Sequence, residues 1–152
     1  MANNNKEFFR KKKIIFSLAG DGDLLNFYKK KVKKLSLSDL IKFDGFLNEK
    51  KLISWFKKLQ IYLHLSKDET TSTSILQAMS MSLPIIASNV GGNKNFLKKF
   101  NKEPNIILTN NDINYVFNLT KELIINPKKR SNMCKLSRKT VLKYYSSQKM
   151  FK

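Results

Sequence analysis

The sequence predicts an α/β fold, a Rossmann-like parallel sheet of about five strands flanked by helices. Short apolar runs alternate along the chain with segments whose apolar residues recur at helical spacing, which is typical of βα units. Glycine-rich or hydroxyl-rich turns follow several of the runs, as they do at the carboxyl ends of strands in open parallel sheets. The 152 residues are enough for one domain with a buried core.

The predicted elements alternate in chain order. Strands are expected at 14–20, 41–46, 61–66, 83–89 and 105–110, and helices at 23–35, 48–59, 72–82 and 93–100. Asn48 suits the N-cap of the second helix. Two further helices are divided at Asn126–Pro127, because proline ends one helix and suits the opening of the next. Residues 1–7 are predicted to be disordered or the tail of a truncated helix, and residues 8–152 to form the domain.

The charge of the chain is strongly positive. Thirty Lys and Arg against eleven Asp and Glu leave a formal net charge of +19, which points to a polyanion such as nucleic acid or an acidic membrane. Only three of these cations are arginines, whereas base readout usually employs the arginine fork. A solvated lysine surface is therefore favoured over a specific nucleic-acid site. Lysines at 29–34, 57–58, 98–99 and 128–129 predict weak peripheral contact with an anionic membrane.

The number of cysteines and the length of the apolar runs indicate the cellular compartment. Cys134 is the only cysteine, so an internal disulfide is excluded and a reducing compartment is expected. The apolar run 14–20 is shorter than a signal-peptide core or a membrane span. We therefore expect a cytoplasmic protein, peripheral at the inner face of the membrane at most. With one histidine and one cysteine, no metal site is expected.

Four predicted loops lie at the carboxyl ends of strands, at 20–23, 45–48, 67–74 and 89–93. Glycines allow a backbone to approach a ligand closely, and the start of the helix near residue 72 offers free N–H groups to a phosphate. Glu69 can accept hydrogen bonds from two hydroxyl groups. The combination predicts an anionic, hydroxyl-rich ligand.

The stretch from Ser66 to Gly92, "SKDETTSTSILQAMSMSLPIIASNVGG", resembles the donor-binding core of GT-B glycosyltransferases of the family-4, or glycosyl transferases group 1, type. The preceding "AGDGDL" and "IKFDGFLNEKKLISWFKKLQIYLHLS" resemble the same family in the same order and spacing, so the likeness covers about residues 14–97. It implies the C-terminal half of a GT-B fold. It also implies retaining transfer of a sugar from a nucleotide donor to a polysaccharide or lipid-linked acceptor, with the nucleotide sugar as substrate and without cofactor or metal.

The resemblance assigns roles to individual residues. Glu69 would be the catalytic residue that hydrogen-bonds the donor sugar, and Gln77 would stand where the family's second glutamate holds the ribose. The backbone amides of Ser72, Thr73 and Ser74 would cradle the diphosphate, and Phe46 and Leu47 would border the nucleotide base. The other donor-binding residues would be Gly20, Gly22, Thr70 and Thr71.

The chain departs from the family pattern in three respects. Gln77 replaces a glutamate, and Lys94 and Asn95 stand where the family has a "GGxxE" glutamate. The family's phosphate-holding Arg and Lys and its acceptor domain precede the first residues of this chain. The sequence therefore predicts a domain that is inactive without an N-terminal half, supplied as a separate domain or subunit. A non-catalytic remnant or subunit and a basic nucleic-acid or membrane-binding α/β module are the alternatives.

Several of these residues also have purely structural explanations. Glu69 could be an ordinary loop acid, and "SILQ" from Ser74 matches a capping box in which Gln77 reaches back to the start of the helix. His64 fits a satisfied core or strand-end residue. Asp21 and Asp23 suit turn and cap geometry. The aromatic residues at helical spacing around Trp55 suit a core.

Overall fold

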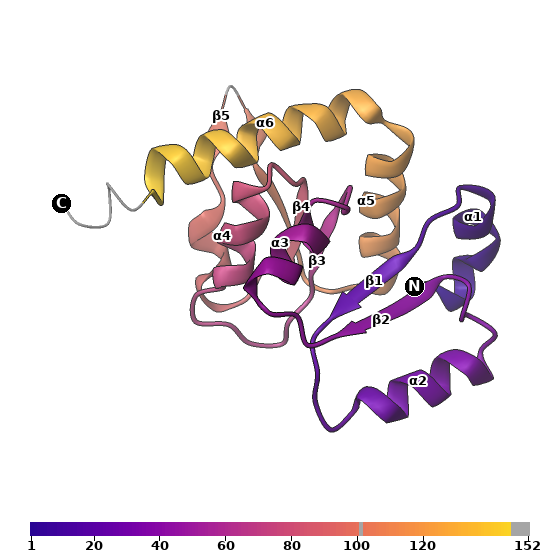
Figure 1. Cartoon of the computed structure of the whole chain (residues 1–152). Coiled ribbons are helices and arrows are strands. Elements are labelled where there is room, and N and C mark those ends of the chain that lie inside the picture. Colours follow the sequence, from indigo (N-terminus) through magenta and orange to yellow (C-terminus); the bar gives the residue numbers. More distant parts are fainter. Residues whose placement is uncertain (101, 147–152) are drawn as a thin grey trace. The chain divides into compact units, whose positions relative to one another are not determined.

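The computed structural model of the protein describes residues 1–100 and 102–146, so that residues 147–152 of the predicted domain lie outside the described part. The chain forms two compact units, Met1–Trp55 and Phe56–Lys152, and each is described by itself. All five predicted parallel strands are present, with α-helices between the first four of them as the sequence predicts (Figure 1). They form two hydrogen-bonded sheets, of two and three strands, in place of one sheet of five.

The first unit is built around one parallel strand pair. A 3-10 helix η1 (Asn3–Asn5) and helix α1 (Lys6–Lys11) precede strand β1 (Phe16–Ala19). Helix α2 (Leu25–Lys34) connects β1 to β2 (Ile41–Gly45), and α3 (Glu49–Phe56) begins after β2. β1 and β2 run parallel from the pair Phe16 and Ile41 to the pair Ala19 and Gly45. The N-terminal residues, predicted as disordered or a helix tail, thus contain η1 and the start of α1.

Phe9 on α1 anchors this unit. Its side chain is fully buried, and its ring lies edge-on to Phe16 of β1 with a centroid distance of 4.9 Å. One residue along, Arg10 forms a fork of two bonds to the carboxylate of Asp39, at 2.8 and 3.1 Å. These hydrogen bonds lower the pKa of Asp39 below its usual value. Packing and a bidentate ion pair together fix α1 against the β1–β2 pair.

Trp55 has a polar contact that the predicted core role does not include. Its indole Nε1 donates to the Ser17 hydroxyl at 2.6 Å and lies 3.1 Å from the Asp44 carboxylate. Asp44 also accepts a hydrogen bond from Ser17 and pairs with Lys42. Burial acts to raise the pKa of Asp44, but these partners outweigh it and lower the pKa. The half-buried carboxylate is therefore satisfied by structural partners.

The second unit contains a three-stranded parallel sheet in the order β3, β4, β7. These strands are β3 (Tyr62–His64), β4 (Ile85–Ser88) and β7 (Ile106–Thr109). In register, Leu63 lies beside Ile86, which lies beside Ile107. The helices of the unit are α4 (Thr73–Ser80), α5 (Ile113–Ile125) and α6 (Pro127–Tyr144), and α6 packs against both others (Figure 1).

The central strand β4 carries the core of this unit. All four of its residues are buried, as expected for a strand covered on both faces of a parallel sheet. Ile86 packs with Leu123 of α5 and Met133 of α6 in one apolar cluster. Full burial of such a side chain contributes about 1.5–3 kcal/mol. Packing in this cluster therefore fixes the strands and so positions their carboxyl ends.

The segment 93–100, predicted as a helix, is folded differently. A 3-10 helix η2 (Gly91–Phe96) is followed by strand β5 (Lys99–Phe100), which pairs antiparallel with β6 (Glu103–Pro104). The buried side chain of Asn105 accepts a hydrogen bond from Lys98 N at 2.6 Å and donates one to Phe96 O at 3.0 Å. These bonds occupy backbone groups that a helix would use, so a distant side chain ends the helix at Phe96. Among the described residues, no helix is both long and apolar enough to cross a membrane.

Candidate functional site

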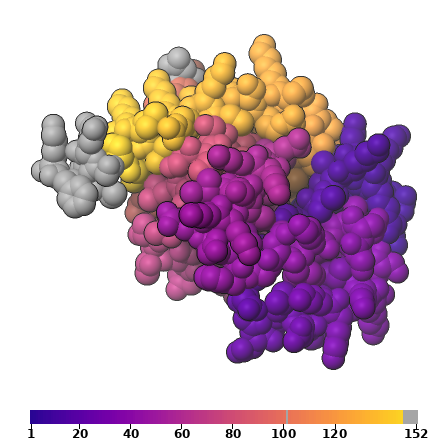
Figure 2. All heavy atoms as spheres, in the orientation of Figure 1, coloured from indigo at the N-terminus to yellow at the C-terminus, as the bar shows by residue number. Residues whose placement is uncertain are grey.

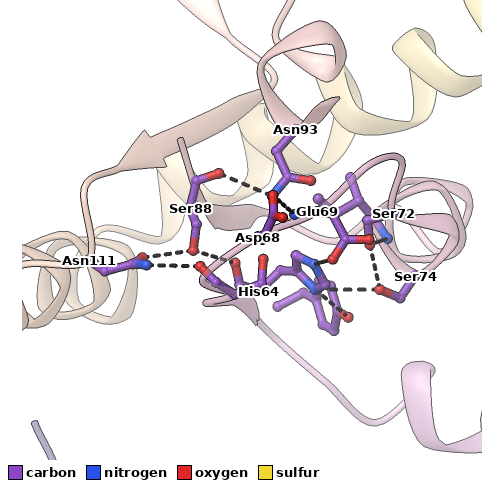
Figure 3. Close-up of polar contacts among 11 residues, drawn as sticks. His64, Asp68, Glu69, Ser72, Ser74, Ser88, Asn93 and Asn111 are labelled. Carbon is purple, nitrogen blue, oxygen red and sulfur yellow. Dashed lines mark hydrogen bonds and ion pairs between the residues drawn. The ribbon is translucent and has the colours of Figure 1, made fainter. Parts of the chain in front are cut away.

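The carboxyl ends of β3, β4 and β7 meet at one edge of the three-stranded sheet, because the strands are parallel. The loop after β3 carries Glu69, the loop after β4 carries the glycine pair at 91–92, and the loop after β7 carries Asn111. Figure 3 shows the polar side chains that converge there. A cavity of about 410 Å³ at the ends of β4 and β7 opens at this edge, lined in part by Asn89, Thr109 and Tyr115.

His64, the last residue of β3, holds Glu69. Its Nε2 atom lies 3.3 Å from Oε2 of Glu69, and its Nδ1 atom lies 3.4 Å from the hydroxyls of both Tyr62 and Ser74 (Figure 3). A carboxylate only accepts hydrogen bonds, so this contact requires the proton on Nε2. The sequence predicts a satisfied strand-end histidine, which is confirmed, but it gives no signal that the partner is Glu69.

Glu69 keeps an accessible carboxylate. A quarter of its side chain is exposed to solvent, and His64 contacts only one of its two oxygens. The backbone N–H of Glu69 donates to the Asp68 carboxylate at 2.8 Å, which fixes the turn that presents it. Within the described residues no other group bonds this carboxylate, so it can also accept hydrogen bonds from a hydroxyl-bearing ligand.

The two glycines of "VGG" press directly on the Glu69 loop. A Cβ atom on Gly91 would lie 1.6 Å from the carbonyl oxygen of Glu69, and one on Gly92 would lie 1.8 Å from that of Thr70. Gly91 also has φ of +46°, which disfavours a side chain, and Gly92 N donates to Glu69 O at 3.0 Å. Only glycine fits at either position, so the glycine pair allows the loop after β4 to pack closely against the loop after β3.

The start of α4 faces the same edge. Ser72 is its N-cap, nearly fully buried, and its hydroxyl accepts a hydrogen bond from Ile75 N at 3.4 Å and contacts the Ser74 hydroxyl at 2.8 Å. Within the described residues, the backbone N–H groups of Thr73 and Ser74 have no acceptor. Free amides and the positive end of the helix dipole suit a phosphate. Thr70 and Thr71, both exposed, complete the loop between Glu69 and this cap.

Gln77 does not form the capping box that its spacing from Ser74 suggests. The helix begins one residue after Ser72, so Gln77 lies beyond the first turn, and its exposed side chain makes no hydrogen bond within the described part of the chain. The structural alternative for Gln77 is therefore wrong, and its amide is free to meet a ligand.

Two asparagines that sequence reasoning missed brace this edge. Asn111, with φ of +69°, donates from Nδ2 to Ser66 O at 3.0 Å and accepts from the Ser88 hydroxyl at 2.8 Å. Asn93 is fully buried and donates to Ser88 O at 3.1 Å. The signal available in the sequence was polar residues directly after apolar strands, in "SNVGGN" and "TNND". Together the asparagines link the ends of β3, β4 and β7.

The other predicted donor-binding residues lie in the first unit. Gly20 and Gly22 follow β1 with φ of +135° and +156°, and Gly20 N donates to Gly45 O at 2.8 Å. Phe46 follows β2 with 78% of its surface exposed, and Leu47 is half-buried. Asp21 accepts from Gly22 N at 2.8 Å, which confirms its turn role. Contact of these residues with a donor stays a prediction of the sequence.

A metal site would need clustered ligands. Across residues 1–100 and 102–146, no three His, Cys, Asp or Glu side chains gather in a way that would hold a metal ion. The second unit brings together the Glu69 carboxylate, the backbone amides at the start of α4 and the glycine pair at 91–92, all at the carboxyl edge of the sheet. Such a set can accept hydrogen bonds from sugar hydroxyls and donate them to phosphate oxygens.

The chain resembles a known family and curated proteins over part of their length. The profile of a family described as glycosyl transferases group 1 matches residues 1–140. Protein CapJ of Staphylococcus aureus is 30% identical over 87 residues, which are 57% of this chain and 22% of CapJ. The chain spans about a fifth of the length of the curated relatives it matches.

Solved structures share the fold. The C-terminal domain of LpcC, a glycosyl transferase group 1 family protein of Francisella tularensis, superposes with a TM-score of 0.73 and 20% identity, over 95% of this chain and 94% of that one. HepE of Anabaena, solved in complex with UDP-glucose, gives a TM-score of 0.74 and 19% identity over 84% of this chain and 36% of HepE. The architecture is thus that of the C-terminal half of a GT-B protein, as the sequence predicts.

Proposed function

The chain belongs to the glycosyl transferases group 1 family, and on that premise we propose that the carboxyl edge of its β3–β4–β7 sheet binds a nucleotide-sugar donor for retaining sugar transfer. The observation that carries the proposal is the arrangement of Glu69 beside the start of α4. Its loop packs on Gly91 and Gly92, one of its carboxylate oxygens is held by His64, and a quarter of its side chain is exposed.

The diphosphate would bind at the start of α4. The N–H groups of Thr73 and Ser74 are free there, and the buried Ser72 cap keeps the helix start in place. Thr70 and Thr71 bring further backbone amides from the adjoining loop. Several amides and a helix dipole stabilise a diphosphate without a metal ion. The structure of HepE with UDP-glucose supports a uridine nucleotide as the first donor to test.

The sugar would lie against Glu69. A carboxylate that accepts two hydroxyl hydrogen bonds orients a sugar ring, and charge-assisted bonds are about twice as strong as neutral ones. Transfer to a hydroxyl of a polysaccharide or lipid-linked acceptor would require a surface for that acceptor. We propose that a separate N-terminal domain or subunit supplies it, and that the chain alone binds the donor without turning it over.

A second candidate is donor binding as a non-catalytic subunit. Gln77 favours it, because a neutral amide stands at the position of the family's ribose-binding glutamate, and Lys94 and Asn95 stand at the position of another family glutamate. Loss of one charged acceptor weakens binding by about 1 kcal/mol, or about fivefold. The fold and the donor edge would remain, with lower affinity.

Isothermal titration of the chain with UDP and with UDP-glucose tests the proposal. We expect both to bind, and Glu69→Gln to weaken UDP-glucose about fivefold or more while leaving UDP nearly unchanged, because only the sugar meets the carboxylate. Glu103→Gln, an exposed acid of the same unit, is the matched control. Equal losses for both ligands, or no binding of either, would contradict the proposed role of Glu69.

A further inference from the structure

Helix α6 has an unusual charge distribution. It carries seven Lys or Arg residues and no acidic residue over Pro127–Tyr144. Lys135, Arg138, Lys139 and Lys143 recur at three- and four-residue spacing, so they share one face of the helix, and all four are exposed. Figure 2 shows side chains of α6, in orange to yellow, projecting into solvent.

The same face forms a shallow groove of about 730 Å³, which also borders the turn after α4. Its floor is mostly carbon, from Leu142, Cys134 and the aliphatic stems of the basic residues. Leu142 is 53% exposed, although it lies in the middle of this charged surface. None of the described residues that line the groove is acidic.

Two of the cations are held in place at the groove. Arg138 donates to the carbonyl oxygen of Ser80 at 2.8 Å, and Lys139 lies 4.7 Å from the centre of the Phe100 ring. Fixed positions reduce the entropy lost when these groups meet a ligand. The surface is thus partly preorganised, with a carbon floor and a rim that carries only positive charge.

We propose that this groove of α6 is a docking surface for an anionic phospholipid leaflet. Four to eight Lys and Arg residues on an amphipathic helix attract acidic headgroups, and each contributes about 1 kcal/mol near the surface. An exposed leucine among them inserts at the headgroup boundary. Charge complementarity selects anionic lipid, and the carbon floor accounts for the apolar part of the contact.

The chemistry of the groove favours a leaflet over nucleic acid. Three of the four cations are lysines, which act as point charges, whereas duplex and base recognition relies on bidentate arginine forks. The one arginine already donates to Ser80 O. A leaflet offers many mobile phosphates, which can move to meet point charges wherever the groove holds them.

Co-sedimentation of the full chain with vesicles tests the proposal. We expect binding to phosphatidylcholine vesicles that contain phosphatidylglycerol, weaker binding at high salt, and none to phosphatidylcholine alone. Changing both Lys135 and Lys143 to Gln should weaken binding ~25-fold, at about fivefold per lysine. The matched control changes Lys29 and Lys33 of α2, which are also exposed, to Gln. This change should weaken vesicle binding much less.

Two further measurements complete the test. Leu142→Ser should weaken vesicle binding about fivefold, whereas Ile113→Ser, also an exposed apolar residue, should not. UDP binding by the groove variants should be unchanged, which separates this proposal from the donor site and shows that the variants fold. Equal losses for the groove and α2 variants, equal binding to neutral vesicles, or tighter binding to an oligonucleotide than to anionic vesicles would each overturn the proposal.

Discussion

His64 Nε2 lies 3.3 Å from Oε2 of Glu69, so the last residue of β3 holds the carboxylate of the loop that follows it. The opposite nitrogen of the ring faces the hydroxyls of Tyr62 and Ser74, and Ser74 belongs to the first turn of α4. The imidazole therefore links Glu69, proposed to bind the sugar, with the helix start proposed to bind the diphosphate.

Replacement of His64 should affect sugar binding selectively. We expect His64→Leu to weaken UDP-glucose binding about fivefold, because Glu69 loses the donor that orients it, and to leave UDP binding within about twofold. His64→Gln, which keeps a donor near the position of Nε2, should retain most of the affinity. Calorimetric titration checks this, and identical behaviour of the Leu and Gln variants would contradict a positioning role for His64.

The glycine pair allows a matched test of the loop contact. Gly91→Ala should destabilise the fold by about 2–3 kcal/mol and abolish donor binding, because its Cβ would meet Glu69 O at 1.6 Å at a φ of +46°. Gly45→Ala has a similar φ of +67° but open space around the Cβ, so strain alone should cost about 1 kcal/mol.

Chemical unfolding of the two glycine variants measures this difference directly. The comparison removes the shared effect of a left-handed backbone and leaves the steric contact with the Glu69 loop. Similar losses of stability for Gly91→Ala and Gly45→Ala would show that the contact does not matter.

Gln77 offers a gain-of-affinity test. Gln77→Glu should strengthen UDP binding about fivefold, because a charged acceptor replaces a neutral one for the ribose hydroxyls. The side chain is exposed and makes no hydrogen bond within the described residues, so stability should not change. Gln77→Ala serves as the control. Weaker binding by the Glu variant would indicate that the diphosphate, and not the ribose, lies near this position.

The Arg10–Asp39 pair predicts a pH dependence of stability. The pKa of Asp39 is lowered by hydrogen bonds from Arg10, so the stability it contributes is present above the ordinary carboxyl pKa of about 3.9. That contribution is lost as the pH falls through the lower pKa of the folded state. The free energies of unfolding of the wild type and of Asp39→Asn should therefore differ near neutral pH and converge in acid. A difference in unfolding free energy that stays constant from neutral to acid pH would contradict a contribution of Asp39 ionisation to stability.

The strands were predictable because apolar runs followed by turn residues report burial on both faces of a parallel sheet. The predicted N-cap at Asn48 accepts from Lys51 N at 3.0 Å, and the predicted stop at Asn126–Pro127 separates α5 from α6. Glu69 was predicted from its place after an apolar strand and, with the glycine pair, from the resemblance to a family, and the structure shows the close approach of the two loops that contain them. Strand patterns, cap residues and a family motif sufficed for these features.

Other features depended on contacts between distant residues. "NKNFLKKF" has helical spacing, yet Asn105 binds the backbone at Phe96 and Lys98 and directs the chain into β5. The links of His64 to Glu69 and of Asn111 to Ser66 and Ser88 join separate loops in the same way. A single sequence carries no periodic signal for such side-chain contacts, so only the structure reveals them.

Binding of the nucleotide diphosphate at the carboxyl edge of the β3–β4–β7 sheet can be followed residue by residue through amide chemical shifts, measured by NMR during titration with UDP. We expect the largest shifts at Thr70–Ser74, with smaller ones at Gly91 and Gly92, and we expect all of them to saturate together. Shifts confined to the lysine-rich surfaces of α2 and α6, or no saturation, would contradict it.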